Sequence, residues 1–120
     1  MSLEENKELI HQVIEVIINQ GNLNAIDDVF APDFVDRSTQ EQVPGPEGVK
    51  QFFLAVRADF PDLRVSIDDL IAEGDKVVIR TTWRGTRPSG QQAARTMIQI
   101  FRIADGKFVE EWNEGGGLFP

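Results

Sequence analysis

The segment from Ile98 to Gly115 constrains the fold more than any other part of the chain. Two apolar-rich runs meet there at Asp105-Gly106, a dipeptide that readily adopts the positive φ angles of a tight hairpin turn. The pattern predicts two long antiparallel strands on either side of this turn. We expect them to be the central pair of a curved sheet.

Upstream of this hairpin, apolar residues recur at every second position, which is the period of a half-buried strand. Strands are expected at residues 63–71, 76–84, 92–104 and, earlier in the chain, 33–37. Asp69 interrupts the alternation of the first long strand, which predicts a bulge near Asp68-Asp69. The acidic residues of this segment and the following turn lack the ligand spacing of a calcium loop, so we expect a solvated turn and no metal.

The first half of the chain has the helical period instead. Helices are expected at residues 3–19, 22–30 and from Pro46 to the break at Pro61. His11, the single histidine, lies on the flank of the first helix, where an exposed position is expected. Helices followed by an antiparallel run predict an α+β fold, a curved antiparallel sheet with three N-terminal helices that form a cone-shaped cavity.

Composition limits the classes of partner. A chain of 120 residues with 41% hydrophobic residues suits one domain, residues 1–120. A net charge of −8 without a basic cluster opposes binding to nucleic acid or to an anionic membrane. The absence of Cys excludes thiolate chemistry, and no secretory signal or membrane span is apparent. We therefore expect a cytoplasmic protein.

Several short strings resemble the SnoaL-like, or polyketide cyclase-like, branch of the nuclear transport factor 2-like superfamily, whose fold is cystatin-like. They are Asn19–Leu23, Ala31–Asp36, Gly45–Gly48, Phe60–Leu63, Ala72–Val77, Trp83–Thr86 and Phe101–Lys107. The resemblance covers nearly the whole chain in the family's order. It implies a protein without a cofactor that forms a homodimer through the sheet and binds a hydrophobic small molecule. Characterised members close polyketide rings by aldol chemistry with acidic and His side chains.

Two positions depart from the family pattern. Arg37 follows Phe-Val-Asp where the family often has His, so no imidazole is available there. The catalytic acid of the aldol cyclase follows the Glu-Glu-Trp tryptophan by four residues, and counting from Trp112 that position is Gly116.

The remaining catalytic candidates are Glu114, Asp36 and Arg37. Strand alternation places Trp112, Glu114 and Gly116 on one face, the face that the family's acid would occupy. The alternative for Glu114 is a solvated side chain at a strand end. Asp36 and Arg37 point to opposite faces, so one of them can line the cavity, unless both belong to an ordinary surface pair.

Five further side chains are expected to line the cavity: Trp112, Met97, Gln99, Phe53 and Trp83. Met97 and Gln99 lie on one face of the 92–104 strand. This face suits the wall of a ligand pocket, a half-exposed sheet face or a dimer interface equally well. Aromatic packing is the alternative for the tryptophans and for Phe53.

Two functions from different classes fit these observations. One is a cofactor-free cyclase- or isomerase-type enzyme that acts on a hydrophobic carbonyl compound by acid/base chemistry. The other is a noncatalytic ligand-binding or dimerisation module that has lost the family's catalytic acid. An epoxide hydrolase on the same architecture would also need a carboxylate at the cavity.

Overall fold

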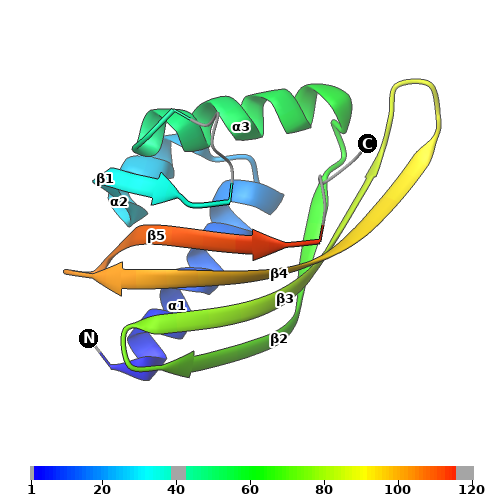
Figure 1. The fold of residues 1–120 in the computed structure, drawn as a ribbon. Helices are drawn as coiled ribbons and strands as arrows, with labels where there is room; N and C mark the ends of the chain where they lie inside the picture. The colour runs from blue at the N-terminus through cyan, green and yellow to red at the C-terminus, as the bar shows by residue number, and fades with distance from the viewer. Residues whose placement is uncertain (1, 39–42, 116–120) are drawn as a thin grey trace.

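A computed structural model describes residues 2–38 and 43–115 of the chain, and Figure 1 shows its ribbon. The elements, in chain order, are α1 (Leu3–Gln12), the π-helical η1 (Val13–Asn19), the 3₁₀ turn η2 (Leu23–Ala25), α2 (Ile26–Val29), β1 (Phe30–Asp36), α3 (Pro46–Asp59), β2 (Arg64–Glu73), β3 (Lys76–Thr86), β4 (Gln92–Ala104) and β5 (Lys107–Glu114). The predicted α+β class is confirmed.

One sheet contains all five described strands in the order β1-β5-β4-β3-β2. Four strands are antiparallel as predicted, whereas β1 runs parallel to β5, so the sheet is mixed. The reason is that α3 and three strands separate β1 from β5 along the chain, and such a long connection permits either direction. The predicted bulge in β2 is confirmed by a register shift between Ile67 and Asp69.

The β4–β5 hairpin forms around the predicted turn, with φ angles of 52° at Asp105 and 76° at Gly106. Its register then shifts, because Ile103 pairs with Phe108 but Arg102 pairs with Glu110. Val109 is the extra residue of a β-bulge. Side chains alternate along a regular strand. The extra residue therefore places every side chain after Val109 on the face opposite to the one that strict alternation from Phe108 predicts.

The predicted helix over residues 3–19 is a continuous helix whose second half is π-helical. It ends at Asn19, whose amide nitrogen donates to the Val65 carbonyl at 3.0 Å and whose amide oxygen accepts from the Val65 N–H at 2.7 Å. Arg57 of α3 donates to the carbonyl oxygens of Ile18 and Asn19. These bonds attach the end of η1 to β2 on one side and to α3 on the other.

The second predicted helix is shorter than expected, because β1 begins at Phe30. Pro32 lies within β1 rather than before it, which is possible because β1 is an edge strand and a proline there removes no essential ladder bond. α3 agrees with its prediction, and His11 is exposed as expected.

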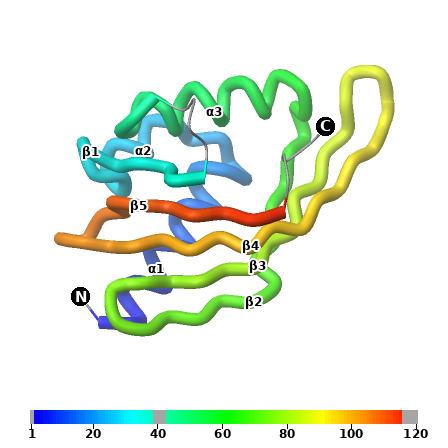
Figure 2. The backbone as a smooth tube through the Cα atoms, in the orientation of Figure 1, coloured from blue at the N-terminus to red at the C-terminus, as the bar shows by residue number. Residues whose placement is uncertain are grey.

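The helices cover one face of the sheet and leave the other face open (Figure 1). α1 packs against β2 and β3, while α3 packs against β1. Beyond the helices the β3–β4 hairpin bends and extends away from the body, as the tube in Figure 2 shows. Between sheet and helices, 22 of the described apolar residues form a buried core, among them Phe34, Phe60 and Phe108. Among the described residues, no helix is both long and apolar enough to cross a bilayer.

Candidate functional site

A pocket of about 650 Å³ lies between the sheet and the helices. The helical side of its wall is apolar, since η1 and α3 contribute Val13, Ile14, Ile18, Val49, Phe52 and Phe53. On the sheet side, Ile79, Trp83, Met97 and Phe101 continue the apolar wall. The polar lining side chains are Gln99 of β4, Asp36 and Ser38 at the end of β1, and Glu111, Asn113 and Glu114 of β5. A volume of this size and a largely apolar wall with one polar side are typical of a small-molecule site.

Glu111 is the central group of the polar wall. Its Oε2 atom accepts hydrogen bonds from Gln99 Nε2 at 3.0 Å and from Asn113 Nδ2 at 3.2 Å. Burial in the apolar pocket, and next the negative charge of Asp36, raise the pKa of Glu111 from 4.5 to about 7. The hydrogen bonds from Gln99 and Asn113 oppose this rise because they stabilise the ionised form. At neutral pH both forms of this carboxyl group are therefore populated.

Asn113 joins Glu111 to the second carboxylate of the wall. Its Nδ2 atom lies 3.4 Å from each oxygen of Asp36. Asp36 Oδ1 also accepts the backbone N–H of Ser38 at 2.9 Å, at the point where β1 ends. The parallel pairing of β1 with β5 brings these groups together, because Asp36 is the register partner of Glu111.

The structure brings six of the eight residues predicted for the site to the pocket wall: Asp36, Glu114, Met97, Gln99, Phe53 and Trp83. Glu114 is exposed and lies at the margin of the pocket. Gly116, the position at which the family's acid was expected, lies outside the described residues.

Arg37 and Trp112 lie away from the pocket, contrary to expectation. Arg37 Nε donates to Glu110 Oε2 at 2.8 Å on the open face of the sheet. Trp112 pairs with Ile100 on the same open face. The physical reason for Trp112 is the bulge at Val109, which turns Glu111 and Asn113 toward the pocket and Trp112 away from it.

Sequence reasoning missed Glu111 and Asn113. Regular alternation that places Trp112 and Glu114 on the inner face turns Glu111 and Asn113 outward, and a bulge one residue long leaves no proline or glycine as a signal here. The available signal was the acidic pair that follows the apolar Phe108-Val109. Two consecutive residues of a strand point to opposite faces, so one of the two glutamates has to face inward.

The cone of helix and curved sheet with an apolar pocket defines a protein of the nuclear transport factor 2-like class. The model of the family described as SnoaL-like polyketide cyclase matches residues 8–115, and the chain belongs to this family. Among curated proteins, none matches the sequence.

Solved structures agree with this assignment. TsrD from Streptomyces laurentii is 26% identical with a TM-score of 0.88, and the match covers 97% of this chain and 91% of that one. AclR from Streptomyces galilaeus, described as a putative hydroxylase, is 28% identical with a TM-score of 0.83, over 96% and 77% of the two chains. IdmH from Streptomyces antibioticus, described as a putative polyketide cyclase, is 28% identical with a TM-score of 0.78, over 92% and 91%.

Proposed function

We propose that the chain is a cofactor-free acid/base enzyme that acts on a hydrophobic carbonyl compound, with Glu111 as the group that transfers the proton. The observation that carries this proposal is the position of Glu111 in an apolar pocket, with its pKa raised to about 7. A general base or acid works best when its pKa lies near the operating pH. The family assignment and the putative cyclase among the similar structures support the same class of chemistry.

The proposed reaction begins with removal of a proton from the carbon next to a carbonyl group by the Glu111 carboxylate. The resulting enolate carbon attacks a second carbonyl of the same molecule and forms the new carbon–carbon bond. The proton held by Glu111 then passes to the oxygen of the attacked carbonyl. The atoms balance without an oxidant or a second substrate, and the same group acts first as base and then as acid.

Each part of the wall has a role in this scheme. The apolar side formed by η1, α3 and β3 binds the hydrophobic body of the substrate and excludes water. Gln99 and Asn113 hold the Glu111 carboxylate in one orientation through the two bonds to Oε2. Asp36 keeps the proton affinity of Glu111 high by its negative charge. Glu114, at the margin, is a candidate for contacts with the polar end of a substrate.

The test compares Glu111→Gln with Glu110→Gln, the same substitution at the neighbouring position on the opposite face. The substrate is a β-diketone with an aromatic substituent, and exchange of its acidic hydrogen for deuterium is followed by NMR at pH 7. Glu111→Gln should slow the protein-catalysed exchange about 10²- to 10⁴-fold, since that is the usual contribution of a general base. Glu110→Gln should leave the rate within about twofold, because it does not reach the pocket.

Binding of the diketone is measured in parallel by calorimetry. If the wild-type protein binds it without accelerating exchange, and Glu111→Gln binds equally well, the noncatalytic ligand-binding function is supported instead. Exchange by Glu111→Gln at the wild-type rate would refute the role of Glu111.

A homodimer through the open face of the sheet is the second part of the proposal. The pairing of neighbouring strands aligns one apolar residue from each of four strands on this face: Ile71, Val78, Ile100 and Trp112. Ile98, on the same strand as Ile100, is 48% exposed, and Ile71 is 63% exposed. An exposed apolar row of this kind is typical of a protein interface.

Sedimentation at micromolar concentration should give about twice the chain mass of 13.5 kDa. Trp112→Lys should convert the dimer to a monomer, because it puts a charge into the apolar row at its β5 end. Leu54→Lys on α3, an exposed apolar residue away from this face, is the matched control and should remain dimeric. A monomeric wild-type protein would exclude this assembly. The cytoplasmic location and the absence of a cofactor stay predictions.

A further inference from the structure

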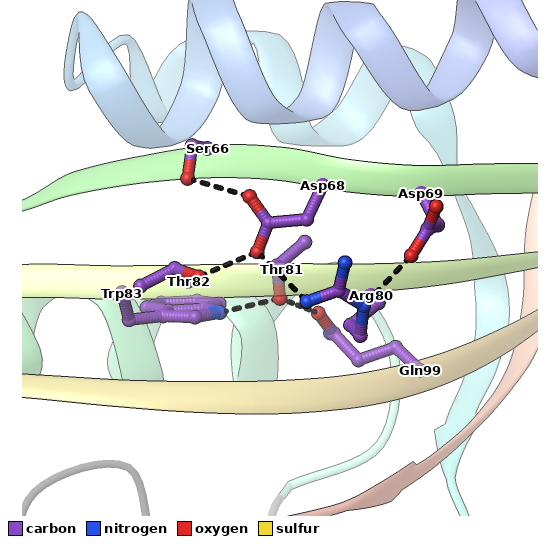
Figure 3. Close-up of polar contacts among 8 residues, drawn as sticks. All are labelled: Ser66, Asp68, Asp69, Arg80, Thr81, Thr82, Trp83 and Gln99. Carbon is purple, nitrogen blue, oxygen red and sulfur yellow. Dashed lines mark hydrogen bonds and ion pairs between the residues drawn. The ribbon is translucent and has the colours of Figure 1, made fainter.

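A chain of hydrogen bonds leads from the buried core to Glu111, and its direction is determined by its first member. Trp83 Nε1 donates to Thr81 Oγ1 at 2.9 Å (Figure 3). An indole nitrogen is a donor only, so this bond can have no other direction. Both residues are buried, with Trp83 2% exposed and Thr81 fully enclosed.

The Thr81 hydroxyl continues the chain of hydrogen bonds in the same donor-to-acceptor order. Because its oxygen accepts the indole hydrogen, its own hydrogen is free to be donated, and Gln99 Oε1 lies 3.2 Å away (Figure 3). The carbonyl end of the Gln99 amide is therefore directed to Thr81. The nitrogen end is left facing Glu111, and it donates to Oε2 at 3.0 Å.

The reverse orientation of the Gln99 amide is unfavourable. It would bring the amide oxygen against the Glu111 carboxylate, where two acceptors would face each other. It would also bring the amide nitrogen against Thr81 Oγ1, which then has no acceptor for its own hydrogen within this chain of bonds. A donor and an acceptor in a buried site are costly when they are left unpaired.

We propose that Thr81 is a positioning residue for Glu111: it accepts the indole hydrogen of Trp83, donates its hydroxyl hydrogen to Gln99, and so holds the Gln99 amide with its nitrogen toward the carboxylate. This inference deepens the proposed function: Thr81 contributes to catalysis only if Glu111 is the group that transfers the proton. The relay of Trp83, Thr81 and Gln99 does not touch the substrate carbon; it acts through Glu111.

The other charged groups on the described pocket wall do not stabilise the ionised form of Glu111 in place of Gln99. The titratable side chains on the described pocket wall are Asp36, Glu111 and Glu114, all of them acids. η1 and α3 face the pocket with apolar side chains. On this wall the ionised form of Glu111 is stabilised by the amides of Gln99 and Asn113, so the orientation of Gln99 affects how strongly Glu111 holds its proton.

The experiment compares Thr81→Val with Thr81→Ser. Valine has nearly the shape of threonine but no hydroxyl, whereas serine keeps the hydroxyl. The readout is the titration of the Glu111 carboxyl group, followed by ¹³C NMR on protein labelled at glutamate and assigned with Glu111→Gln. Thr81→Val should move the midpoint of this titration upward by about one pH unit, because a hydrogen bond to the charged form is lost. Thr81→Ser should stay within about 0.3 unit of wild type.

Trp83→Phe provides a second variant, for the case that Thr81→Val does not fold. Phenylalanine keeps the stacked contact with Phe53 but has no N–H, so the Thr81 hydroxyl loses its fixed direction. The midpoint should again move upward, by less than in Thr81→Val. Titrations of Thr81→Val and Trp83→Phe that coincide with wild type would overturn the relay.

The NMR titration requires no substrate, so the two proposals fail separately. A shifted titration in Thr81→Val together with full exchange activity in Glu111→Gln would keep the relay and refute the role of Glu111 in catalysis. An unshifted titration in Thr81→Val together with an inactive Glu111→Gln would refute the relay and keep the role of Glu111 in catalysis.

Discussion

Glu110 and Glu111 are neighbours on β5 and occupy opposite faces of the sheet. Glu110, on the open face, accepts from Arg102 Nε at 2.5 Å and from Arg37 Nε at 2.8 Å. These bonds lower the pKa of Glu110. Glu111, on the enclosed face, has no cationic hydrogen-bond partner in the part of the chain that the structure describes, and burial and Asp36 raise its pKa to about 7.

The contrast shows that the partner decides the behaviour of a carboxyl group more than the residue type does. On the open face the arginines satisfy the charge, and water screens what remains. On the enclosed face neutral amides stabilise the charge only in part, and the charge that acts on Glu111 is that of another acid, Asp36. A group held in this way exchanges its proton near neutral pH, which suits catalysis but costs stability.

The largest expected effect is on the stability of the protein at high pH. The folded protein binds the Glu111 proton more tightly than the unfolded chain, so this group makes the protein less stable as the pH rises from 4.5 to about 7. Above pH 7 the full cost remains, about 3 kcal/mol from the size of the shift. Glu111→Gln should therefore be more stable than wild type by about 3 kcal/mol at pH 8, and nearly equal at pH 5.

Urea unfolding at the two pH values measures this difference. A variant that is less stable than wild type at pH 8 would contradict the buried position of the charge. Such a result would mean that the lost bonds from Gln99 and Asn113 outweigh the desolvation of the carboxylate.

The second effect concerns the like charge beside Glu111. Asp36→Asn keeps an oxygen that can accept the Ser38 N–H but removes the negative charge. The pKa of Glu111 should then fall by about one unit, since a nearby like charge is what raises it after burial. The same ¹³C titration detects the shift. Asp27→Asn, an exposed residue paired with Lys50, is the matched control and should leave the titration of Glu111 unchanged.

The smallest effect is expected on the open face. Glu110→Gln removes the acceptor of two arginines, but pairs of this kind contribute little because solvent screens them. The loss in unfolding free energy should be below about 1 kcal/mol and should shrink further in 1 M salt. A loss as large as the gain in Glu111→Gln would remove the contrast between the two faces.

Much of the fold was predictable because its determinants are local. Alternation gave β2, β3 and β4, the Asp105-Gly106 turn gave the hairpin, and the spacing of Val49, Phe52 and Phe53 gave α3. The π-helical form of η1 was not predictable, since a 3.6-residue pattern fits both kinds of helix. The parallel pairing of β1 also depends on contacts between distant segments, which a local pattern does not contain.

The site was predictable only in part for a related reason. Alternation within the strand makes Gln99 a candidate for the cavity wall and allows only one of Asp36 and Arg37 to line the cavity; Gln99 and Asp36 line the pocket. Glu111 was missed because its orientation depends on the register between β4 and β5, which shifts at Val109. Composition provides no information on that shift, because either register pairs apolar and acidic residues across the hairpin.

The bulge at Val109 makes the chemistry of the pocket depend on the register of β5 against β4. A regular ladder that paired Arg102 with Val109 would leave the sequence unchanged, yet it would bring Trp112 and Glu114 to the inner face and turn Glu111 and Asn113 outward. The same β5 sequence would therefore present different groups to the pocket in the two registers. A shift of one residue in this register would exchange two side chains of the pocket wall at once, which no single substitution can do.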